Sequence, residues 1–455
     1  MPQRESAASS APPTPPAPAA PALAPEAAEA PEAETPFNIG DAEDSLERMC
    51  ELNARFGDLY RVYSPGRRRY AYVINHPDDV RRVLVSNHAN YRKGFGLDRV
   101  KMLLGNGLVT SEGEFWRAQR YLMQPMFHRR VITQFASVIA AANEQLLERW
   151  ERLAASGERI NVTDEMSALT LEVILRAVFG TDLDRLSQQL GKNPFEIIAR
   201  ESVRDLTFAY RFRQLRKLVS ELAERRRSEA TGHFDFIGML VHARHRATGA
   251  PMGERELVDE VMTLIIAGHE TAASTLNSAW YLLSQHPEAE TKLHAEIDAA
   301  PLCDVLDLAA TEALPYTRGV LMETLRLYPA VWLLSRKSIG PDVLAGCAVP
   351  AGVDVLLSPY LIHRHPRFWS EPAAFHPERA EFAPQTVRPP LAYVPFSAGP
   401  RHCIGESMAL FEMTVHLHRV ARRYRLLYEP GQPMPLEALI NLRSRGPLMM
   451  QLQRR

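Results

Sequence analysis

Cys403 is the residue whose surroundings first suggest chemistry. It lies in the stretch FSAGPRHCIG, residues 396–405, between Gly399 and Gly405 and directly before a helical pattern. Most isolated cysteines are small buried apolar residues. At the start of a helix, however, the backbone N–H groups of the first turn favour the anionic sulfur, and glycines let the backbone approach a flat, bulky group. The pattern therefore fits a nucleophile, a redox sensor or an axial ligand to a metal cofactor.

The stretch GHET, residues 268–271, places two ionisable groups and a hydroxyl in the middle of the longest helical pattern, 254–285. At 1.5 Å per residue this helix would be roughly 48 Å long, enough to cross the core, where polar groups are costly unless each is hydrogen-bonded. One interpretation is a glycine that lets a second helix approach, with Thr271 bonded to its own backbone. The other is a local break in the helix beside a groove for a small molecule, where Glu270 and Thr271 pass protons.

Glu323 and Arg326, in METLRLYP, share a helix face because they are three residues apart. Apolar residues surround them, and the helical pattern stops at Pro329. A buried ion pair of this kind needs a further partner, and Arg379 in FHPERA is available for it. The same spacing elsewhere predicts exposed pairs, each worth roughly 0.2–0.5 kcal/mol. These are Glu114/Arg117, Glu201/Arg204 and Glu224/Arg227.

Trp116 and Arg120, four residues apart in EGEFWRAQRYLMQPMF, lie on one face of an amphipathic helical pattern. The simpler interpretation is an aromatic ring packed under the arginine stem. The alternative is an anion held by the indole N–H and the guanidinium. The two residues alone do not decide between these interpretations.

The chain that must position these side chains has 455 residues, of which 46% are hydrophobic and 24% are charged, and a formal net charge of −1. These values are typical of a globular protein with a large core, and the balanced charge argues against a general nucleic-acid binder. The four cysteines are widely separated, so neither a disulfide framework nor a Cys-x-x-Cys metal site is expected. A reducing, cytoplasmic setting fits this cysteine usage.

Residues 1–36 are rich in Pro, Ala and Glu and lack aromatic residues. We expect a disordered tail here, because such a segment cannot bury enough apolar surface to offset the entropy of ordering it. It lacks the basic start and apolar run of a signal peptide, and no later segment approaches the roughly 18 apolar residues of a membrane span. Residues 37–455 are expected to form a single domain.

Helical patterns dominate this domain, so we expect a mainly α fold with small β-sheets. The expected helices include 133–154, 163–179, 254–285, 312–327 and 404–424. Short runs bounded by turn residues predict strands; they are 67–75, 332–339, 353–358 and 448–453.

Five motifs follow one another along the chain: WRxxR at 116–120, AGHET at 267–271, ETLR at 323–326, PER at 377–379 and FSAGPRHCIG at 396–405. Together they resemble the cytochrome P450 family of haem-thiolate monooxygenases, in its soluble bacterial type. The resemblance covers essentially everything after the tail. It implies the P450 fold, in which a long oxygen-binding helix lies over the haem, and it implies haem b (iron protoporphyrin IX) as the cofactor.

The resemblance gives each matching position a role. Cys403 matches the thiolate ligand of the haem iron, which favours O–O cleavage by pushing electron density toward the bound oxygen. Glu270 and Thr271 match the acid–alcohol pair that supplies protons. Haem contacts are expected from Trp116, Arg120, Arg336, Phe396, Gly399, Arg401 and Gly405, and Glu323, Arg326 and Arg379 match a buried triad that braces the cysteine loop. Ser397 departs from the glycine that is common at its position.

The same resemblance predicts an apolar substrate pocket and therefore a hydrophobic substrate, such as a terpenoid, a fatty acyl chain or a polyketide. The expected reaction inserts one oxygen atom of O2 into this substrate, by hydroxylation or epoxidation. The expected lining residues are Thr263, Ile266, Ala267, Val331, Trp332, Leu333, Leu439 and Ile440.

No flavin or iron–sulfur motif is visible in the chain, so electrons are expected from a ferredoxin with its reductase or from a flavodoxin. Arg117, Arg129, Arg130 and His402 are expected to form a basic face for such an acidic partner, although a merely solvated basic face fits the sequence equally well. A peroxide-driven peroxygenase and a non-catalytic haem sensor or carrier are the alternatives. The acid–alcohol pair favours the monooxygenase, because neither a carrier nor a peroxide-driven enzyme depends on proton delivery to dioxygen.

Overall fold

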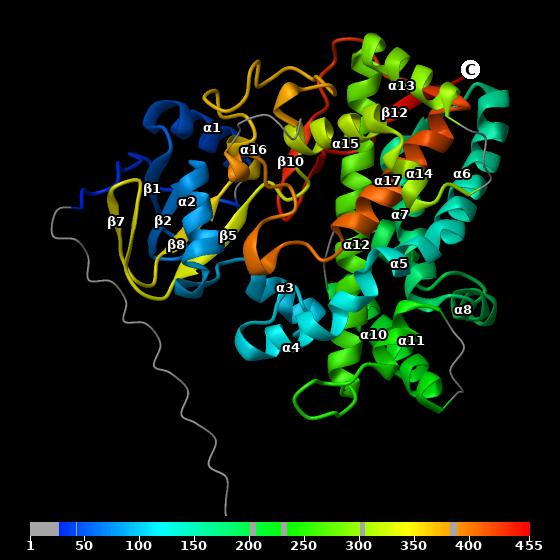
Figure 1. Ribbon diagram of the computed structural model, residues 1–455, viewed down its shortest axis with the longest axis horizontal. Helices are drawn as coiled ribbons and strands as arrows, with labels where there is room; N and C mark the ends of the chain where they lie inside the picture. The colour runs from blue at the N-terminus through cyan, green and yellow to red at the C-terminus, as the bar shows by residue number, and fades with distance from the viewer. Residues whose placement is uncertain (1–26, 42, 201–205, 229–233, 301–304, 383–388) are drawn as a thin grey trace, which may run out of the picture.

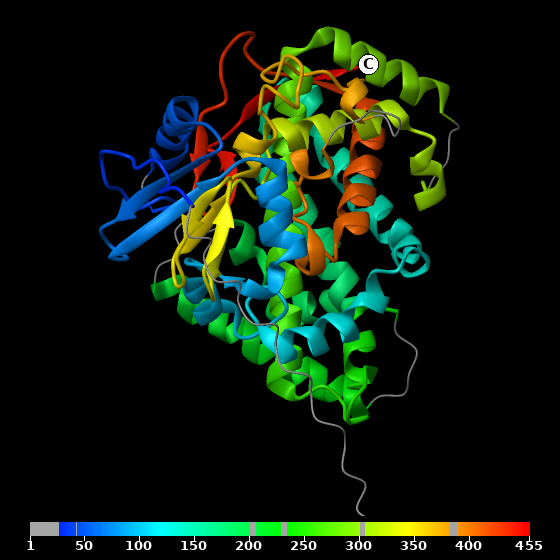
Figure 2. The same cartoon turned by 60° about the vertical axis from the view of Figure 1, so that its left-hand side comes forward.

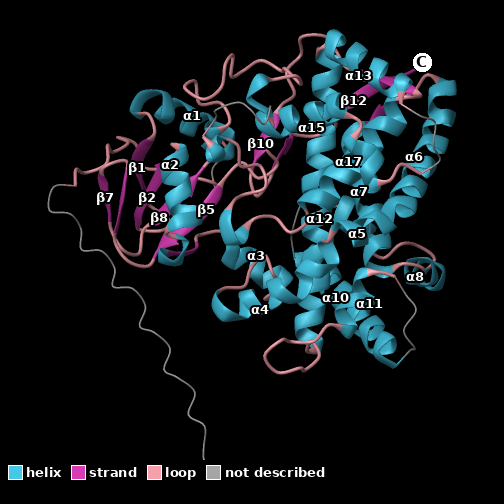
Figure 3. Cartoon of the chain, in the orientation of Figure 1, coloured by secondary structure: helices cyan, strands magenta, loops and turns pink. Residues whose placement is uncertain are grey.

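The structure, a computed structural model, describes residues 27–41, 43–200, 206–228, 234–300, 305–382 and 389–455. Helices make up the larger part of the molecule, and most strands gather on one side of it (Figures 1 and 3). The expected fold class, mainly α with small β-sheets, is confirmed.

The central helix of the larger part is α12 (Glu254–Gln285). Leu257, Val261 and Leu276 are fully buried along it, because apolar side chains recur at helical spacing on the faces that meet neighbouring helices. These neighbours, which Figure 2 shows from a second side, are α7 (Val162–Phe179), α10 (Leu206–Ser228), α15 (Pro315–Leu327) and α17 (Glu406–Ala421).

The remaining helices either pack around this group or lie beside the strands (Figure 1). They are α1 (Ser45–Phe56), α2 (Pro77–Arg81), α3 (Leu97–Leu104), α4 (Gly113–Met123), α5 (Arg129–Ile132), α6 (Ala136–Ser156), α8 (Asp182–Leu190), α9 (Glu196–Arg200), α11 (Phe236–His242), α13 (Pro287–Ala299), α14 (Leu308–Glu312) and α16 (Pro359–Ile362). Across the described ranges, none of the helices combines the length and apolar character needed to cross a membrane.

The largest sheet has five strands in the order β1-β2-β8-β5-β3. β2 and β8 are parallel, and the other neighbours are antiparallel. The strands are β1 (Leu59–Ser64), β2 (Arg69–Ile74), β3 (Tyr91–Lys93), β5 (Leu334–Ser338) and β8 (Asp354–Leu357). Three smaller sheets contain β4 (Arg159–Asn161), β12 (Met449–Arg454) and β9 (Tyr424–Leu427); β6 (Asp342–Leu344) and β7 (Cys347–Val349); and β10 (Leu436–Ala438) and β11 (Leu442–Ser444).

All four expected strands exist, as β2, β5, β8 and β12, and the expected helix 254–285 coincides with α12. Three expected helices have clearly different bounds: α6 covers Ala136–Ser156 in place of 133–154, and the other two are shorter. α15 starts at Pro315 and not at 312, because proline cannot donate the backbone bond that a helix interior needs. α17 ends at Ala421 and not at 424, because Tyr424 begins β9 and pairs with β12.

The expected tail boundary at residue 36 is wrong for residues 27–36. Ala28 bridges to Cys347 of β7, Glu32 bridges to Arg61 of β1, and Ala33 is buried. The carboxylate of Glu32 also lies 2.9 Å from the Arg61 guanidinium. Pairing with strands far along the chain therefore orders a segment whose own composition cannot. Residues 1–26 lie outside the described residues.

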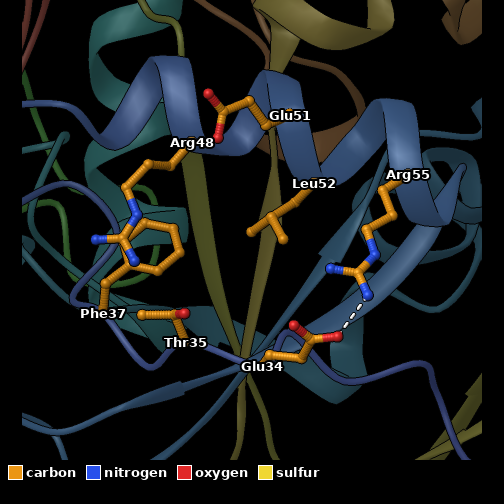
Figure 4. A pocket seen from close by; sticks show the side chains of 7 residues that line it. All are labelled: Glu34, Thr35, Phe37, Arg48, Glu51, Leu52 and Arg55. Atoms are coloured by element: carbon orange, nitrogen blue, oxygen red, sulfur yellow. Dashed lines mark hydrogen bonds and ion pairs between the residues drawn. The ribbon is translucent and has the colours of Figure 1, made fainter.

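The same segment forms one wall of a pocket of about 330 Å³, and α1 forms the other wall (Figure 4). The guanidinium carbon of Arg48 lies 3.9 Å from the centre of the Phe37 ring, and Arg55 is paired with Glu34. The lining side chains are therefore largely occupied with one another. None of them belongs to the residues that the sequence places at a functional site.

Candidate active site

The loop 396–405, the orange segment before α17 in Figure 1, turns back on itself. The N–H of Cys403 donates to the carbonyl oxygen of Phe396 at 2.9 Å. Gly399 has a left-handed φ of +67°, and a Cβ there would lie 2.0 Å from the carbonyl oxygen of Leu84. Only glycine is compatible with that backbone approach, so Gly399 sets the path of the loop that carries Cys403.

The Cys403 side chain is exposed, although protein atoms crowd it. Burial, the largest influence, raises the pKa of its thiol, while the backbone N–H groups of Gly405 and Glu406 and the charge of Arg120 lower it. An exposed thiol that is desolvated by its surroundings faces an enclosed space and not open solvent. The start of α17 alone thus does not make this sulfur a thiolate; a cation bound to it is also needed.

One arginine lies in the cysteine loop and a second lies beside it. The guanidinium carbon of Arg401 lies 3.9 Å from the centre of the Trp116 ring on α4, and Arg401 donates to the carboxylate of Glu112 at 2.7 Å. Arg120, one turn further along α4, donates to the carbonyl oxygen of His402 at 2.8 Å. Burial lowers the pKa of both arginines. The structure therefore brings the Trp/Arg motif and the cysteine motif together.

Lys93 on β3 is a further cation near Arg401, and the sequence analysis did not single it out. It lies directly opposite Arg336 of β5 in the antiparallel sheet. Burial first, and then the charges of Arg401 and Arg336, lower the pKa of Lys93 to about 7. Burial and Arg401 likewise lower the pKa of Arg336 to about 10. The sequence hints at a buried cation here only through the basic pair Arg-Lys in the short run YRK.

The middle of α12 faces an accessible space. Its residues are buried from Leu257 to Ile265 and from Ala272 to Leu276, whereas Ala267 between them is exposed. A residue that is exposed in the middle of a core helix must face a hollow in the interior. Ala267 and Thr271 are four residues apart and therefore lie on the same helix face.

Both features of the simpler interpretation of residues 268–271 are present. A Cβ on Gly268 would lie 2.9 Å from Cδ1 of Ile174 on α7, so the glycine lets that helix approach. The hydroxyl of Thr271 donates to the carbonyl oxygen of Ala267 at 2.9 Å. The local break of the second interpretation is absent, because α12 runs unbroken through these residues. Gly268 therefore packs against α7 while Thr271 lies on the accessible face of the same unbroken helix.

Glu270 points to a different neighbour from Thr271. Its Oε2 accepts a hydrogen bond from Nδ2 of Asn441 at 2.9 Å. Asn441 lies in the turn between β10 and β11, and sequence reasoning did not single it out. The C-terminal hairpin therefore contacts the acid of the expected acid–alcohol pair.

Glu323, Arg326 and Arg379 meet in the core beside α15. Nε of Arg326 lies 2.7 Å from Oε2 of Glu323, and Nε of Arg379 lies 2.7 Å from Oε1 of the same carboxylate. Arg326 also donates to the carbonyl oxygen of His363 at 3.0 Å. Nε2 of His363 accepts from the N–H of Val394 at 2.8 Å, two residues before Phe396. The triad is thus linked to the start of the cysteine loop.

The expected pocket residues divide into two groups. Ile266, Ala267, Val331, Leu333, Leu439 and Ile440 are partly or fully exposed. Trp332 and Thr263 are not, and the expectation that they line a pocket is wrong. Trp332 is fully buried and donates to the carbonyl oxygen of Leu439 at 2.9 Å. Thr263 is 2% exposed, because Gly107 packs so closely against it that a Cβ on the glycine would lie 2.2 Å from Oγ1 of Thr263.

Comparison with protein families agrees with this geometry. The family model described as Cytochrome P450 matches residues 35–200 and 192–448. The chain belongs to the cytochrome P450 family. Cyclooctat-9-en-7-ol 5-monooxygenase from Streptomyces melanosporofaciens is 34% identical over 406 residues, which cover 85% of this chain and 86% of that protein. Cyclooctatin synthase from the same organism is 34% identical over 90% of this chain and 91% of its own length.

A third relative, pentalenene oxygenase from Streptomyces avermitilis, is 29% identical over 85% of this chain and 87% of its own length. Among solved structures, a crystal structure of a cytochrome P450 (CYP102L1) has a TM-score of 0.83 at 22% identity, covering 95% of this chain and 100% of that chain. The cytochrome P450DA heme domain has a TM-score of 0.82 at 23% identity, covering 94% and 98%. The chain has the P450 fold and is a cytochrome P450 monooxygenase.

Membership of the P450 family implies a haem iron, and the residues at the site fit one. Within the described residues no three His, Cys, Asp or Glu side chains are grouped to hold a metal ion, so an iron at Cys403 needs a porphyrin for its other ligands. A haem also brings two carboxylates. Burial disfavours the charged form of all four cations around the loop, and neighbouring arginines also disfavour it for Lys93 and Arg336. These cations match the charge of the two carboxylates; they are Lys93, Arg120, Arg336 and Arg401.

Proposed function

We propose that this P450 inserts one oxygen atom of O2 into a cyclic terpenoid, using haem b ligated by Cys403 and electrons from a separate protein. The observation that carries the proposal is the sulfur of Cys403, which is crowded yet accessible and receives backbone N–H groups from the start of α17. Haem bound there supplies the activation of dioxygen and the transfer of one oxygen atom to a C–H bond. The remaining steps fall to side chains of this chain.

The cationic group around the loop would hold the two haem carboxylates. Arg120 is fixed by the His402 carbonyl, and Arg401 is fixed by Trp116 and Glu112. These fixed positions favour binding, since little side-chain entropy is lost when the carboxylates arrive. Charge-assisted hydrogen bonds of this type are about twice as strong as neutral ones.

Thr271 and Glu270 would move the protons. The hydroxyl of Thr271 donates to the Ala267 carbonyl, which leaves its own oxygen able to accept a hydrogen bond from water on the exposed face of α12. Glu270 is its neighbour in the chain and would supply the proton through such a water. The acid is the donor, and the alcohol places the proton.

The substrate is proposed from the lining and from the relatives. Beside Glu270 and Thr271, apolar side chains are accessible near the middle of α12 and after α15: Ile266, Ala267, Val331 and Leu333. An apolar lining binds mainly by shape and buried area. The relatives are named for cyclooctat-9-en-7-ol and pentalenene, which favours a cyclic terpenoid over a fatty acyl chain or a polyketide.

The electron donor is proposed to be a ferredoxin with its reductase, or a flavodoxin, acting in the cytoplasm. α5, which carries Arg129 and Arg130, packs against α17, the helix that follows Cys403. Arg129 is paired with Glu312, and Arg117 is paired with Glu114. Arg130 is exposed and therefore carries most of the charge that this face offers to an acidic partner.

Two measurements test the proposal. The reduced carbonyl spectrum should show thiolate ligation in the purified protein and lose it in Cys403→Ser, while Cys347→Ser, a control at a partly buried free cysteine, should keep it. Cyclic terpenoids should then shift the haem spin state on binding. A protein without haem, or a spectrum that Cys403→Ser leaves unchanged, would contradict the assignment. Turnover with hydrogen peroxide but not with a ferredoxin system would show a peroxygenase, and binding without turnover would show a carrier.

A further inference from the structure

One face of α12 is hydrogen-bonded to the C-terminal hairpin. Glu270 and Ser274 are four residues apart, so both point the same way. Oε2 of Glu270 accepts from Nδ2 of Asn441 at 2.9 Å, and the hydroxyl of Ser274 donates to the carbonyl oxygen of Leu442 at 2.5 Å. The first contact joins the hairpin to the acid of the proposed proton pathway. The second joins the hairpin backbone to Ser274, which has no part in that pathway.

The hairpin that carries Asn441 is fixed on both sides of it. The N–H of Leu442 donates to the carbonyl oxygen of Ala330 at 2.9 Å. Trp332, fully buried, donates to the carbonyl oxygen of Leu439 at 2.9 Å. The backbone on either side of Asn441 is therefore held to the segment after α15. A side chain on such a backbone can hold its partner in one orientation, which is what preorganisation requires.

We propose that Asn441 is a positioning residue for proton delivery: its Nδ2–H holds Oε2 of Glu270 and fixes the carboxyl group in the orientation from which it serves Thr271. The inference rests on the proposed function. A glutamate side chain has several rotatable bonds, so each contact that this partly buried carboxyl group makes narrows its range of orientations. Asn441 supplies a neutral donor, which restrains the carboxylate without accepting the proton itself.

The balance of the reaction shows what loss of this restraint does. Without substrate, complete proton delivery gives water, O2 + 4e⁻ + 4H⁺ → 2H2O, with the electrons coming from NADPH through a ferredoxin. When delivery fails early, two electrons and two protons leave as hydrogen peroxide, O2 + 2e⁻ + 2H⁺ → H2O2. The peroxide formed per NADPH therefore measures proton delivery, and no knowledge of the substrate is needed.

The experiment uses the haem-loaded protein, a plant-type ferredoxin, its reductase and NADPH, with no added substrate. Asn441→Ala should raise the peroxide share of the electrons by roughly threefold or more, as the displacement of a proton donor predicts. Ser274→Ala is the matched control, because it removes a bond to the same hairpin without touching the acid, and it should leave the share unchanged. In a Glu270→Gln background, Asn441→Ala should add no further change.

A second measurement does not depend on turnover. In ¹⁵N-labelled protein, the side-chain amide signal of Asn441 should move in Glu270→Gln and stay in place in Ser274→Ala. Equal peroxide shares in Asn441→Ala and wild type, an equal rise in Ser274→Ala, or additive effects with Glu270→Gln would each overturn the inference. Failure of the proposed function would show separately, as wild-type protein that lacks a thiolate-ligated haem or takes no electrons from NADPH.

Discussion

Lys93 lies directly opposite Arg336 across the β3–β5 pair, so two cations face each other in a partly buried part of the sheet. Like charges in such a position destabilise a sheet. Glu112 and Glu260 are the carboxylates that raise the pKa of Lys93, and they do not compensate for burial. An anion bound here would offset this cost, which supports the proposal of a ligand with carboxylates at this position.

The stability of the haem-free chain should depend on pH through Lys93. Its folded pKa, about 7, lies below the usual value of 10.5, so between pH 8 and 10 the unfolded chain binds one more proton there than the folded chain. The free energy of unfolding should rise with pH by up to about 1.4 kcal/mol per unit from this group. Urea denaturation at pH 8, 9 and 10 measures the rise.

Lys93→Met should remove this contribution, so the difference in slope between variant and wild type isolates it. Glu260 acts in the opposite direction at lower pH, because burial raises its pKa to about 8 and its cost appears as it ionises; measurement above pH 8 avoids most of that effect. Loading with haem should also flatten the rise. Equal slopes in the variant and wild type would show that Lys93 keeps its proton when folded.

The charge of Glu323 should contribute more to stability than that of any exposed glutamate with the same spacing. Glu323→Gln leaves the guanidinium groups of Arg326 and Arg379 buried without their carboxylate. Breaking a buried ion pair in this way costs about 3–5 kcal/mol. The loss should be visible in the free energy of unfolding, and the protein should also release haem more readily because the triad is linked to the cysteine loop.

Glu114→Gln is the control for that prediction. Glu114 and Arg117 have the same i, i+3 spacing, but both are exposed on α4. The substitution should change the free energy of unfolding by less than about 0.5 kcal/mol. Similar losses in the two variants would mean that burial of the triad adds nothing to its stability.

Replacing Ser397 by glycine, the residue common at this position of the cysteine motif, should stabilise the fold. Its φ is +61°, in the left-handed region, and its hydroxyl has no hydrogen-bond partner among the described residues. Left-handed backbone costs a non-glycine residue about 1–2 kcal/mol, of which the greater freedom of glycine in the unfolded chain cancels about 0.4–1 kcal/mol. Ser397→Gly should thus raise the free energy of unfolding by up to about 1.6 kcal/mol.

Thermal and urea denaturation would measure that gain. Ser187→Gly, in the right-handed helix α8, should instead lower stability by roughly 0.5–1 kcal/mol. If both substitutions destabilise the chain, the backbone at Ser397 is not strained.

Local pattern was sufficient to predict the parts of the site whose geometry is local. Helical spacing placed Glu323 beside Arg326, and the cost of burying the pair pointed to Arg379 as a further partner, which the structure brings to the same carboxylate. The period of α12 likewise predicted a helix through residues 268–271. Spacing acts within one helix, and the third partner follows from the cost of a buried charge that lacks one.

Apart from the contact of Arg379 with Glu323, contacts between distant segments were not predictable in this way. The register of β3 against β5 places Lys93 opposite Arg336, and Asn441 contacts Glu270, a residue 171 positions earlier. Neither contact can be read from the local sequence. Residues 27–36 have a composition typical of disorder, yet strands β1 and β7 order them. The pocket prediction for Trp332 failed for the same reason, since the ring turns into the core beside the sheet.

Arg130 should matter for electron transfer at low salt. It is exposed on α5, which packs against α17 close to the cysteine loop, and Arg129 beside it is already paired with Glu312. Arg130→Glu should lower the rate of reduction by an acidic ferredoxin roughly five- to tenfold at low ionic strength, because charge steering acts on association. Stopped-flow reduction at about 20 mM and about 500 mM salt would measure this, and the difference should nearly vanish at the higher concentration.

Arg152→Glu, the same charge reversal at an exposed position of α6, is the control. If it slows reduction as much as Arg130→Glu does, net charge and not a docking face controls the rate.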